Sequence, residues 1–261
     1  MKTDYAEGMA LITGATSGIG RELTKLFAAD NYDLILIARN KDELVNFAKE
    51  LQGKHDIFIK VIAKDLSTPD AAKEIYKELQ KEEITIDVLV NSAGFATRGK
   101  YWEIDYAEDL QQIQLNITSL AMLTKLLLPQ MVEQKSGKIL NIASVAAFYP
   151  GPLMSIYYAS KAFVLSFSEG LREELRGTGV TVTVLAPGPT RTGFAKRAGL
   201  LSSKLFHMKL MDPKIVAQIG YEGLMAGRDL VISGWGNKIQ AFASRLSPYA
   251  LSARVIKRLQ Q

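Results

Sequence analysis

The sequence predicts an α/β protein built on a doubly wound, mostly parallel sheet of about seven strands, with helices on both faces. Three observations predict this fold. Short β-branched runs alternate with longer amphipathic stretches, several runs are almost continuously apolar, and a glycine-rich segment joins the first run to the first amphipathic stretch. Continuous apolar runs are typical of strands buried on both faces, and strand–helix alternation of this length is typical of right-handed βαβ units.

The expected strands are residues 9–13, 32–38, 57–63, 86–91, 137–143, 180–186 and 230–233. The expected helices cover 18–30, 41–51 and about 106–134, with another that begins near Pro69. In the first helix Leu23, Leu26 and Phe27 recur at helical spacing and should face the core. No internal repeat, low-complexity segment or linker divides the chain. Residues 1–261 are therefore expected to form one domain, with its core over about 8–233.

One segment inside this core, residues 193–213, follows neither the helical nor the strand period. It is rich in Leu, Phe and Met, and such a segment between core elements is often a lid or binding loop. We expect a lid here, with a pair of short packing helices as the alternative.

Composition excludes several function classes. The chain has no cysteine and only two histidines, His55 and His207, so disulfides, metal sites and a Ser-His-Asp triad are not expected. The N-terminus has no long apolar run and no segment has about 18 consecutive apolar residues, so neither a signal peptide nor a membrane span is expected. The longest candidate, SLAMLTKLLLP, is interrupted by Lys125 and Pro129. These features favour a cytoplasmic protein.

The net charge of +5 lies entirely at the C-terminal end. No acidic residue follows Asp229, whereas five bases do, namely Lys238, Arg245, Arg254, Lys257 and Arg258. Without these five, 27 of the 32 basic residues remain against 27 acidic ones, so the body is neutral and no nucleic-acid binding is predicted.

The tail, residues 237–261, should contain a helix that starts at Ser247-Pro248 and carries a stripe formed by Leu251, Val255, Ile256 and Leu259. We expect this basic amphipathic helix to dock on the chain's own body or on a sister subunit. A membrane-surface helix and a solvated tail are the alternatives.

The segment TGATSGIG, residues 13–20, lies directly after the first strand and opens the first helix. Gly14 permits a tight turn, Gly18 allows the backbone to approach a pyrophosphate, and Gly20 allows close helix–strand packing. The helix N-terminus adds free N–H groups and the positive end of its dipole. This context predicts a Rossmann-type dinucleotide site, the alternative being a glycine-rich turn that binds no ligand.

The end of the second strand favours NADP(H) over NAD(H). An NAD enzyme usually carries an acidic residue there, but this chain has Ala38 followed by Arg39. A guanidinium can bind a 2′-phosphate. Alternatively, Arg39 is a solvated base that pairs with Asp42 or Glu43.

The stretch YYASK, residues 157–161, offers a catalytic phenol. Lys161 is four residues after Tyr157 and three after Tyr158, and both spacings bring side chains together on a helix. A neighbouring cation lowers the pKa of a phenol toward the range that a general acid needs. Helical geometry leaves open which tyrosine serves.

Several motifs occur in the order of a known family: TGATSGIG, Asp65-Leu66, NSAG (91–94), Asn116, Ser144, Tyr157-x-x-x-Lys161 and Pro187-Gly188. The core resembles the short-chain dehydrogenases/reductases, in particular their single-domain branch. One departure is Ser92, where the family usually has asparagine. The resemblance implies that Tyr157 donates a proton, that Lys161 assists it and binds the nicotinamide ribose, that Ser144 binds the substrate oxygen, and that Asn116 interrupts its helix and holds a water in a proton relay.

By the same resemblance, Asp65 contacts the adenine and Pro187, Gly188 and Thr192 enclose the nicotinamide. The cofactor residues expected in all are Gly14, Thr16, Ser17, Gly18, Ile19, Gly20, Arg39, Asn40, Asp65, Leu66, Asn91, Ala93, Gly94, Tyr157, Lys161, Pro187, Gly188, Thr190 and Thr192. The implied activity is NADPH-dependent interconversion of a carbonyl and an alcohol by a homodimer or homotetramer.

Apolar residues near these motifs indicate a lipophilic small-molecule carbonyl, such as a 3-oxoacyl or steroid-like compound. The expected substrate residues are Ser144, Phe95, Phe148, Tyr149, Met154 and Phe206. A non-catalytic NADPH-binding regulatory protein is the main rival, but such sensors commonly lose the tyrosine or the lysine. A sugar-nucleotide epimerase usually has a larger C-terminal domain and different glycine spacing.

Overall fold

A computed structural model describes residues 7–200, 210–244 and 249–260. Its centre is a seven-stranded sheet in the order β3-β2-β1-β4-β5-β6-β7, and every neighbouring pair is parallel. The strands are β1 (Met9–Thr13), β2 (Asp33–Ala38), β3 (Ile59–Ala63), β4 (Val88–Asn91), β5 (Gly137–Ile142), β6 (Val180–Ala186) and β7 (Leu230–Ile232). The predicted doubly wound α/β fold is confirmed.

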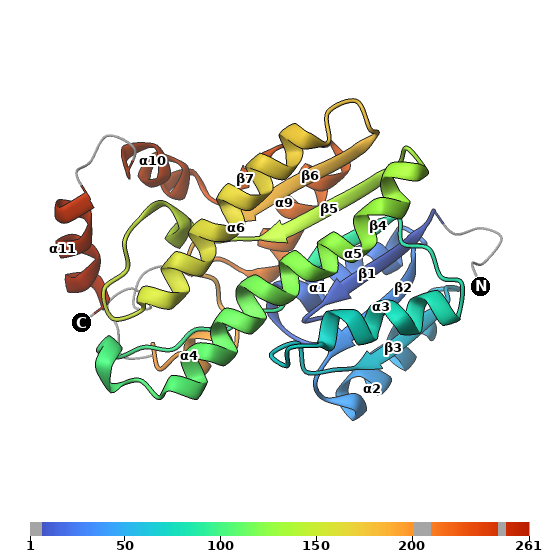
Figure 1. Ribbon diagram of the computed structural model, residues 1–261, viewed down its shortest axis with the longest axis horizontal. Helices are drawn as coiled ribbons and strands as arrows, with labels where there is room; N and C mark the ends of the chain where they lie inside the picture. Colours follow the sequence, from blue (N-terminus) through green and yellow to red (C-terminus); the bar gives the residue numbers. More distant parts are fainter. Residues whose placement is uncertain (1–6, 201–209, 245–248, 261) are drawn as a thin grey trace.

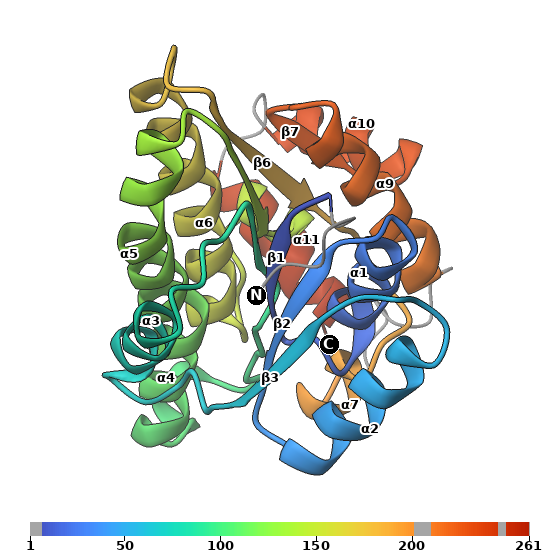
Figure 2. The ribbon, with the colours of Figure 1, turned by 90° about the vertical axis from the view of Figure 1, so that its right-hand side faces the viewer.

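Helices cover both faces of the sheet (Figures 1 and 2). One face carries α1 (Gly18–Ala29), α2 (Lys41–Gln52) and α9 (Pro213–Met225), whose apolar residues share one buried cluster with the strands. The other face carries α3 (Ala71–Lys81), α5 (Leu120–Glu133) and α6 (Ser155–Glu174), which form a second buried cluster. Both faces of each central strand are therefore buried, as the continuous apolar runs predicted.

Two strands begin two residues later than predicted, at Ile59 and Val88. Polar side chains occupy the edge of the sheet at these points. The N–H of Phe58 donates to Asp33 Oδ1 at 2.8 Å, and the N–H of Met9 donates to Asp87 Oδ2 at 2.7 Å. These carboxylates bind backbone donors at the amino end of the sheet.

The order of the strands places a crevice between β1 and β4. The chain runs outward from β1 through β2 to β3 and then returns to the other side of β1 as β4. Leu11 of β1 therefore pairs with Ile35 of β2 on one side and with Leu89 of β4 on the other. Connections leave the carboxyl ends of these two strands in opposite directions, and ligands bind at such a switch point.

The long helix predicted over 106–134 is confirmed as α4 (Tyr106–Ile113), a π-helical segment η2 (Gln114–Ser119) and α5. By length and composition this 28-residue helix could span a membrane, although no such segment was expected. That is weak evidence, because a core helix passes the same test. Leu123, Leu127 and Met131 pack in the core on one face of the sheet.

The predicted lid is described only in part. A short helix, α7 (Phe194–Arg197), opens it, and residues 201–209, with Leu201, Phe206 and Met208, lie outside the described residues. The two ends are held together, because Arg191 N donates to the carbonyl of Met211 at 2.9 Å.

The tail forms two helices, α10 (Trp235–Ser244) and α11 (Tyr249–Gln260). The helix start expected at Ser247-Pro248 lies outside the described residues. Described parts of α11 dock on the chain's own body: the side chain of Gln260 is 1% exposed, and Gln260 Nε2 donates to Tyr158 Oη at 2.9 Å.

Candidate functional site

A cavity of about 1200 Å³ opens at the carboxyl edge of the sheet. All of the predicted cofactor residues except Asn91 line it, together with Ser144, Tyr149 and Met154. The loops after the central strands supply one part of the wall, and α7, α10 and α11 supply another. The fold therefore brings together residues that are more than 200 positions apart in the sequence.

The glycine loop between β1 and α1 is built for close backbone approach. Gly14 has a φ of 66°, which favours glycine, and its N–H donates to the carbonyl of Ile37 at 2.8 Å. A Cβ on Gly20 would lie 2.3 Å from the carbonyl oxygen of Gly14. Thr13, which the sequence analysis did not single out, accepts hydrogen bonds at Oγ1 from Ser92 N (3.0 Å) and Ala93 N (3.1 Å). It fastens the glycine loop to the NSAG segment.

Asn91 is the exception among the predicted cofactor residues. Its side chain is 3% exposed and turns into the protein, where Nδ2 donates to Asn141 Oδ1 (2.8 Å) and Thr124 Oγ1 (3.1 Å). Asn91 and Asn141 are partners in the β4–β5 register, so their side chains share one face of the sheet. Asn91 therefore supports the strands, and Ser92 lines the cavity in its place.

Two guanidiniums, Arg39 and Arg197, lie at the adenosine end around Asp65. Burial acts to raise the pKa of Asp65, but hydrogen bonds from Ser67 and the charges of Arg39 and Arg197 together bring the pKa below its ordinary value. None of the ion pairs among the described residues joins Arg39 to Asp42 or Glu43. Arg39 is exposed and lines the cavity, as an anion-binding residue requires.

Two residues near Arg39, Asn40 and Arg197, differ from the sequence prediction. The side chain of Asn40 caps α2 by accepting from the N–H groups of Asp42 (3.1 Å) and Glu43 (3.2 Å). Arg197, which sequence reasoning missed, extends from α7 with its guanidinium 4.2 Å from the ring centroid of Phe95. Its only sequence signal was its place in the predicted lid.

Asn116 interrupts its helix, as predicted, because it lies within the π-helical segment. Its side chain is 2% exposed and bonds both backbone groups of Phe95: Oδ1 accepts from Phe95 N at 3.1 Å, and Nδ2 donates to Phe95 O at 2.9 Å. A Cβ on Gly94 would be 3.2 Å from Asn116 Oδ1 and 3.6 Å from Lys161 Nζ, so the amide lies close to the ammonium group. The π-helical turn holds the amide beside the cavity.

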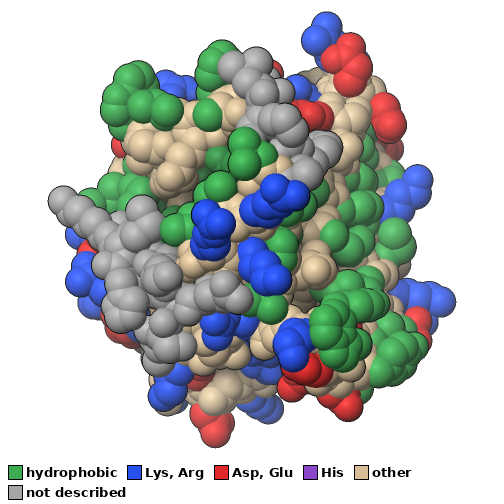
Figure 3. Space-filling model, turned by 90° about the vertical axis from the view of Figure 1, so that its left-hand side faces the viewer, with side chains coloured by type: hydrophobic (Ala, Val, Ile, Leu, Met, Phe, Trp, Pro, Cys, Tyr) green, Lys and Arg blue, Asp and Glu red, His purple; other side chains and the backbone are tan. Residues whose placement is uncertain are grey.

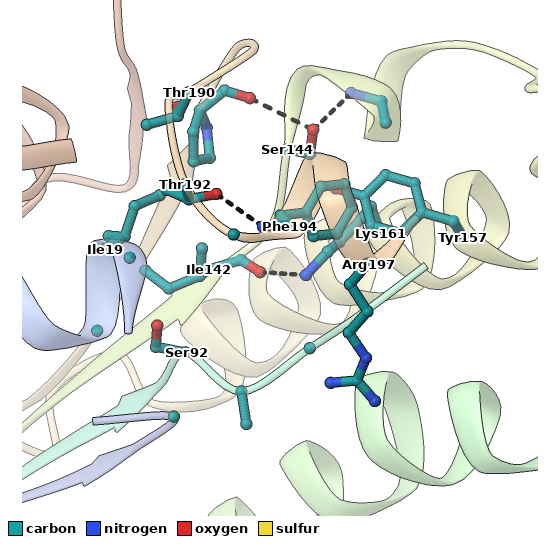
Figure 4. Close-up of a pocket in the computed structure, with 18 of the residues that line it drawn as sticks. Ile19, Ser92, Ile142, Ser144, Tyr157, Lys161, Thr190, Thr192, Phe194 and Arg197 are labelled. Atoms are coloured by element: carbon teal, nitrogen blue, oxygen red, sulfur yellow. Dashed lines mark hydrogen bonds between the residues drawn. The ribbon is translucent and has the colours of Figure 1, made fainter. Parts of the chain in front are cut away.

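Ser144, Tyr157 and Lys161 converge at one side of the cavity (Figure 4). Ser144 follows β5, and its Oγ accepts from Ala146 N (3.1 Å) and donates to the carbonyl of Pro187 (3.3 Å). Lys161 is 7% exposed and donates from Nζ to the carbonyl of Ile142 at 2.8 Å. That nitrogen lies 5.9 Å from the centroid of the Tyr157 ring.

The two tyrosines that helical spacing could not separate have different partners. Tyr157 is hydrogen-bonded to Ser144, and its ring packs against Phe194 of α7 with centroids 5.2 Å apart. The hydroxyl of Tyr158 accepts from Gln260 of α11, and its ring fills the space that Gly151 leaves. Of the two tyrosines, Tyr157 therefore lies beside Ser144 and Lys161, whereas Tyr158 bonds Gln260.

The protein environment shifts two of these groups. Burial raises the pKa of Tyr157 above its ordinary value, and the bond to Ser144 opposes this shift. Burial also lowers the pKa of Lys161 to about 8. At neutral pH Lys161 is therefore a cation beside a protonated phenol, which is the arrangement that a proton donor requires.

The Lys161 shift predicts a pH dependence of stability in the cofactor-free protein. Between pH 8 and 10.5 the unfolded chain keeps a proton that the folded chain has lost, so stability rises with pH through this window. Below pH 8 both states are protonated and the penalty for burying the charge is complete. Lys161→Met removes the penalty, so its advantage over wild type in unfolding free energy should shrink by about 2 kcal/mol between about pH 7.5 and about pH 9.5.

Denaturant titrations at both pH values measure this difference. The control is Lys77→Met, at an exposed position of α3, whose difference from wild type should not change with pH. An advantage of Lys161→Met that stayed constant across the window would contradict the lowered pKa.

The substrate end of the cavity agrees only partly with the predictions. Tyr149 and Met154 line it, whereas Phe95 and Phe148 do not, and Phe206 lies outside the described residues. The backbone of Phe95 is bonded to Asn116, and its ring faces Arg197 instead of the cavity.

The remaining apolar wall comes from segments that sequence reasoning did not assign to the site. These wall residues are Phe194, Leu200, Val255, Ile256 and Leu259. Arg98 holds this part in place, because its guanidinium donates to the carbonyls of Gly199 and Gln260. Within the described ranges, no group of three or more His, Asp or Glu side chains could hold a metal ion.

Known proteins are similar to this chain in sequence and in fold. Residues 8–200 match the family described as short chain dehydrogenase. A short chain dehydrogenase of Pseudocercospora fijiensis is 38% identical over 69% of this chain and 58% of its own, so this chain spans less than two thirds of that relative. A very-long-chain 3-oxoacyl-CoA reductase of Anas platyrhynchos is 35% identical over 83% of this chain and 69% of its own. The structure of a short-chain dehydrogenase from Sphingobium yanoikuyae in complex with NADPH superposes with a TM-score of 0.83, at 31% identity over 92% of this chain and 93% of that one.

Proposed function

The chain belongs to the short-chain dehydrogenase family and is an oxidoreductase, and from this premise we propose that it interconverts a lipophilic carbonyl and its alcohol with NADP(H). The observation that carries the proposal is the convergence of Ser144, Tyr157 and Lys161 in one cavity with the glycine loop. The backbone around Gly14 and Gly20 leaves no room for a side chain, as close approach to a pyrophosphate requires.

The chain's own residues position the substrate and move its proton. Ser144 and Tyr157 donate hydrogen bonds to the carbonyl oxygen, so negative charge can develop there. Tyr157 transfers its proton to that oxygen, and the cation of Lys161 stabilises the resulting phenolate. The nicotinamide supplies the hydride when bound. Asn116 holds the backbone next to Lys161, where a water relay would return the proton.

Arg39 and Arg197 support a preference for NADPH, because both add positive charge at the end of the cavity where the adenosine 2′-phosphate would lie. We expect Arg39→Ala to raise the KM for NADPH about tenfold, the size of one lost charge-assisted contact at an exposed site, and to change the KM for NADH little. Arg197→Ala should act in the same direction. Arg176→Ala, which removes an exposed guanidinium just after the end of α6, is the control. Equal changes with NADPH and NADH would contradict this role.

An apolar substrate is supported by the wall that Met154, Leu200, Ile256 and Leu259 form, and by the 3-oxoacyl-CoA reductase among the relatives. The test is NADPH oxidation by the purified chain with 3-oxoacyl thioesters, steroid ketones and small aldehydes or ketones. We expect kcat/KM to rise with the apolar surface of the substrate. Tight NADPH binding without turnover of any compound would instead favour a regulatory NADPH-binding protein. The cytoplasmic location and the homo-oligomeric state stay predictions from the sequence.

A further inference from the structure

The helix α10 has an apolar face that the described structure leaves uncovered. Trp235, Ile239 and Phe242 follow one another at spacings of four and three residues, so they form one stripe, and they are 77%, 58% and 68% exposed. The opposite side of the helix is held: Ala241 and Ser244 are buried, and the hydroxyl of Tyr149 donates to the carbonyl of Gln240 at 2.5 Å. Scattered exposed apolar residues are ordinary, but a contiguous stripe of large ones marks an interaction surface.

The neighbouring helix α11 adds further apolar residues and most of the charge. Leu251 and Val255 are 55% and 48% exposed, and Arg254, Lys257 and Arg258 are exposed beside them. Both helices lie at one end of the molecule, and the view onto that end shows Lys and Arg side chains flanked by hydrophobic ones (Figures 1 and 3). With Lys238 of α10, this face has basic residues and no acidic ones on either helix.

The same two helices form part of the cavity wall. Asn237 and Gln240 of α10, and Val255, Ile256 and Leu259 of α11, line the cavity. Val255 is both exposed and part of the lining, so the outer face of α11 borders the cavity.

We propose that the face formed by the exposed residues of α10 and α11 docks on an anionic lipid surface. The stripe of Trp235, Ile239 and Phe242 enters the interfacial layer, and Arg254, Lys257 and Arg258 bind the headgroups. A second copy of the chain fits this face less well, because a twofold contact would set its bases against the same bases. Delivery of an apolar carbonyl from the lipid is a consequence that rests on the proposed function. The docking itself does not depend on it.

The test is sedimentation of the full chain with vesicles of phosphatidylcholine containing about 30% phosphatidylserine, compared with phosphatidylcholine alone. We expect binding to the anionic vesicles that weakens between about 0.1 M and about 0.5 M NaCl. The triple variants Trp235→Ala/Ile239→Ser/Phe242→Ser and Arg254→Gln/Lys257→Gln/Arg258→Gln should each bind at least about tenfold more weakly. The matched control Lys73→Gln/Lys77→Gln/Lys81→Gln removes three exposed bases of α3 and should bind like wild type.

A second measurement reports insertion directly. The chain has two tryptophans, so Trp102→Phe leaves Trp235 as the only one, and its emission should shift to the blue on anionic vesicles. Circular dichroism establishes that each variant is folded, and no substrate is needed for either measurement. Absence of wild-type binding to anionic vesicles, or equal loss in the α3 control, would overturn the proposal. So would a dimer that the α10 substitutions dissociate while vesicles bind neither form, because the face would then join two copies.

Discussion

Tyr157→Phe should lower kcat by about 10³-fold, which corresponds to about 4 kcal/mol of transition-state stabilisation. The substitution removes the proton that the forming alkoxide needs, and it removes the hydroxyl that Ser144 contacts. It leaves Lys161 bonded to the carbonyl of Ile142 and leaves the glycine loop unchanged. NADPH affinity, measured by fluorescence titration, should therefore stay within about threefold of wild type, while single-turnover reduction almost stops.

The matched control is Tyr158→Phe, one residue further along the same helix. Its hydroxyl bonds Gln260 and contacts neither Ser144 nor Lys161 through any bond among the described residues, so we expect at least about a tenth of the wild-type turnover to remain. Losing the bond to Gln260 should cost about 1 kcal/mol of stability. If Tyr158→Phe stopped turnover and Tyr157→Phe did not, the roles assigned to the two phenols would be reversed.

Local patterns were sufficient to predict the sheet, because the strands are short β-branched runs, several of them almost continuously apolar, and each connection is long enough for a crossover helix. The glycine loop was predictable for the same reason, since its strand, turn and helix are adjacent in the sequence. The choice between Tyr157 and Tyr158 could not be predicted from local patterns, because both spacings bring a tyrosine to Lys161. It depended on the family pattern, and the structure separates the two tyrosines by the different groups that their hydroxyls meet.

Contacts between distant parts of the chain were beyond sequence reasoning. Gln260 meets Arg98 and Tyr158 across 162 and 102 residues, and no local period indicates that α11 would form a wall of the cavity. The direction of the Asn91 side chain was beyond sequence reasoning for a related reason. Its position in the NSAG motif suggested the cofactor, but its pairing with Asn141 turns the side chain inward.

Gly20→Ala should weaken NADPH binding by about 100-fold and lower the unfolding free energy by about 2 kcal/mol. The new Cβ would lie 2.3 Å from the carbonyl oxygen of Gly14, in the glycine loop, and 3.0 Å from Ser92 Oγ, in the segment after β4. The first of these is backbone, so no side-chain rotation relieves the overlap and the loop itself must move. A loop displaced by about 1 Å no longer presents its N–H groups to a pyrophosphate.

The chain offers a matched control for this substitution in Gly170, which is also helical. A Cβ at Gly170 would meet nothing within 4 Å, and the residue is exposed in the interior of α6. Gly170→Ala should therefore raise the unfolding free energy by about 0.5–1 kcal/mol, through helix propensity alone, and leave NADPH affinity unchanged. Denaturant titration measures the unfolding free energy of both variants, and NADPH titration measures their cofactor affinity. Together they separate the effect of steric overlap at Gly20 from the effect of helix propensity at Gly170. Wild-type NADPH affinity in Gly20→Ala would show that the loop tolerates a side chain there and that its glycines are not needed to bring the backbone to the cofactor.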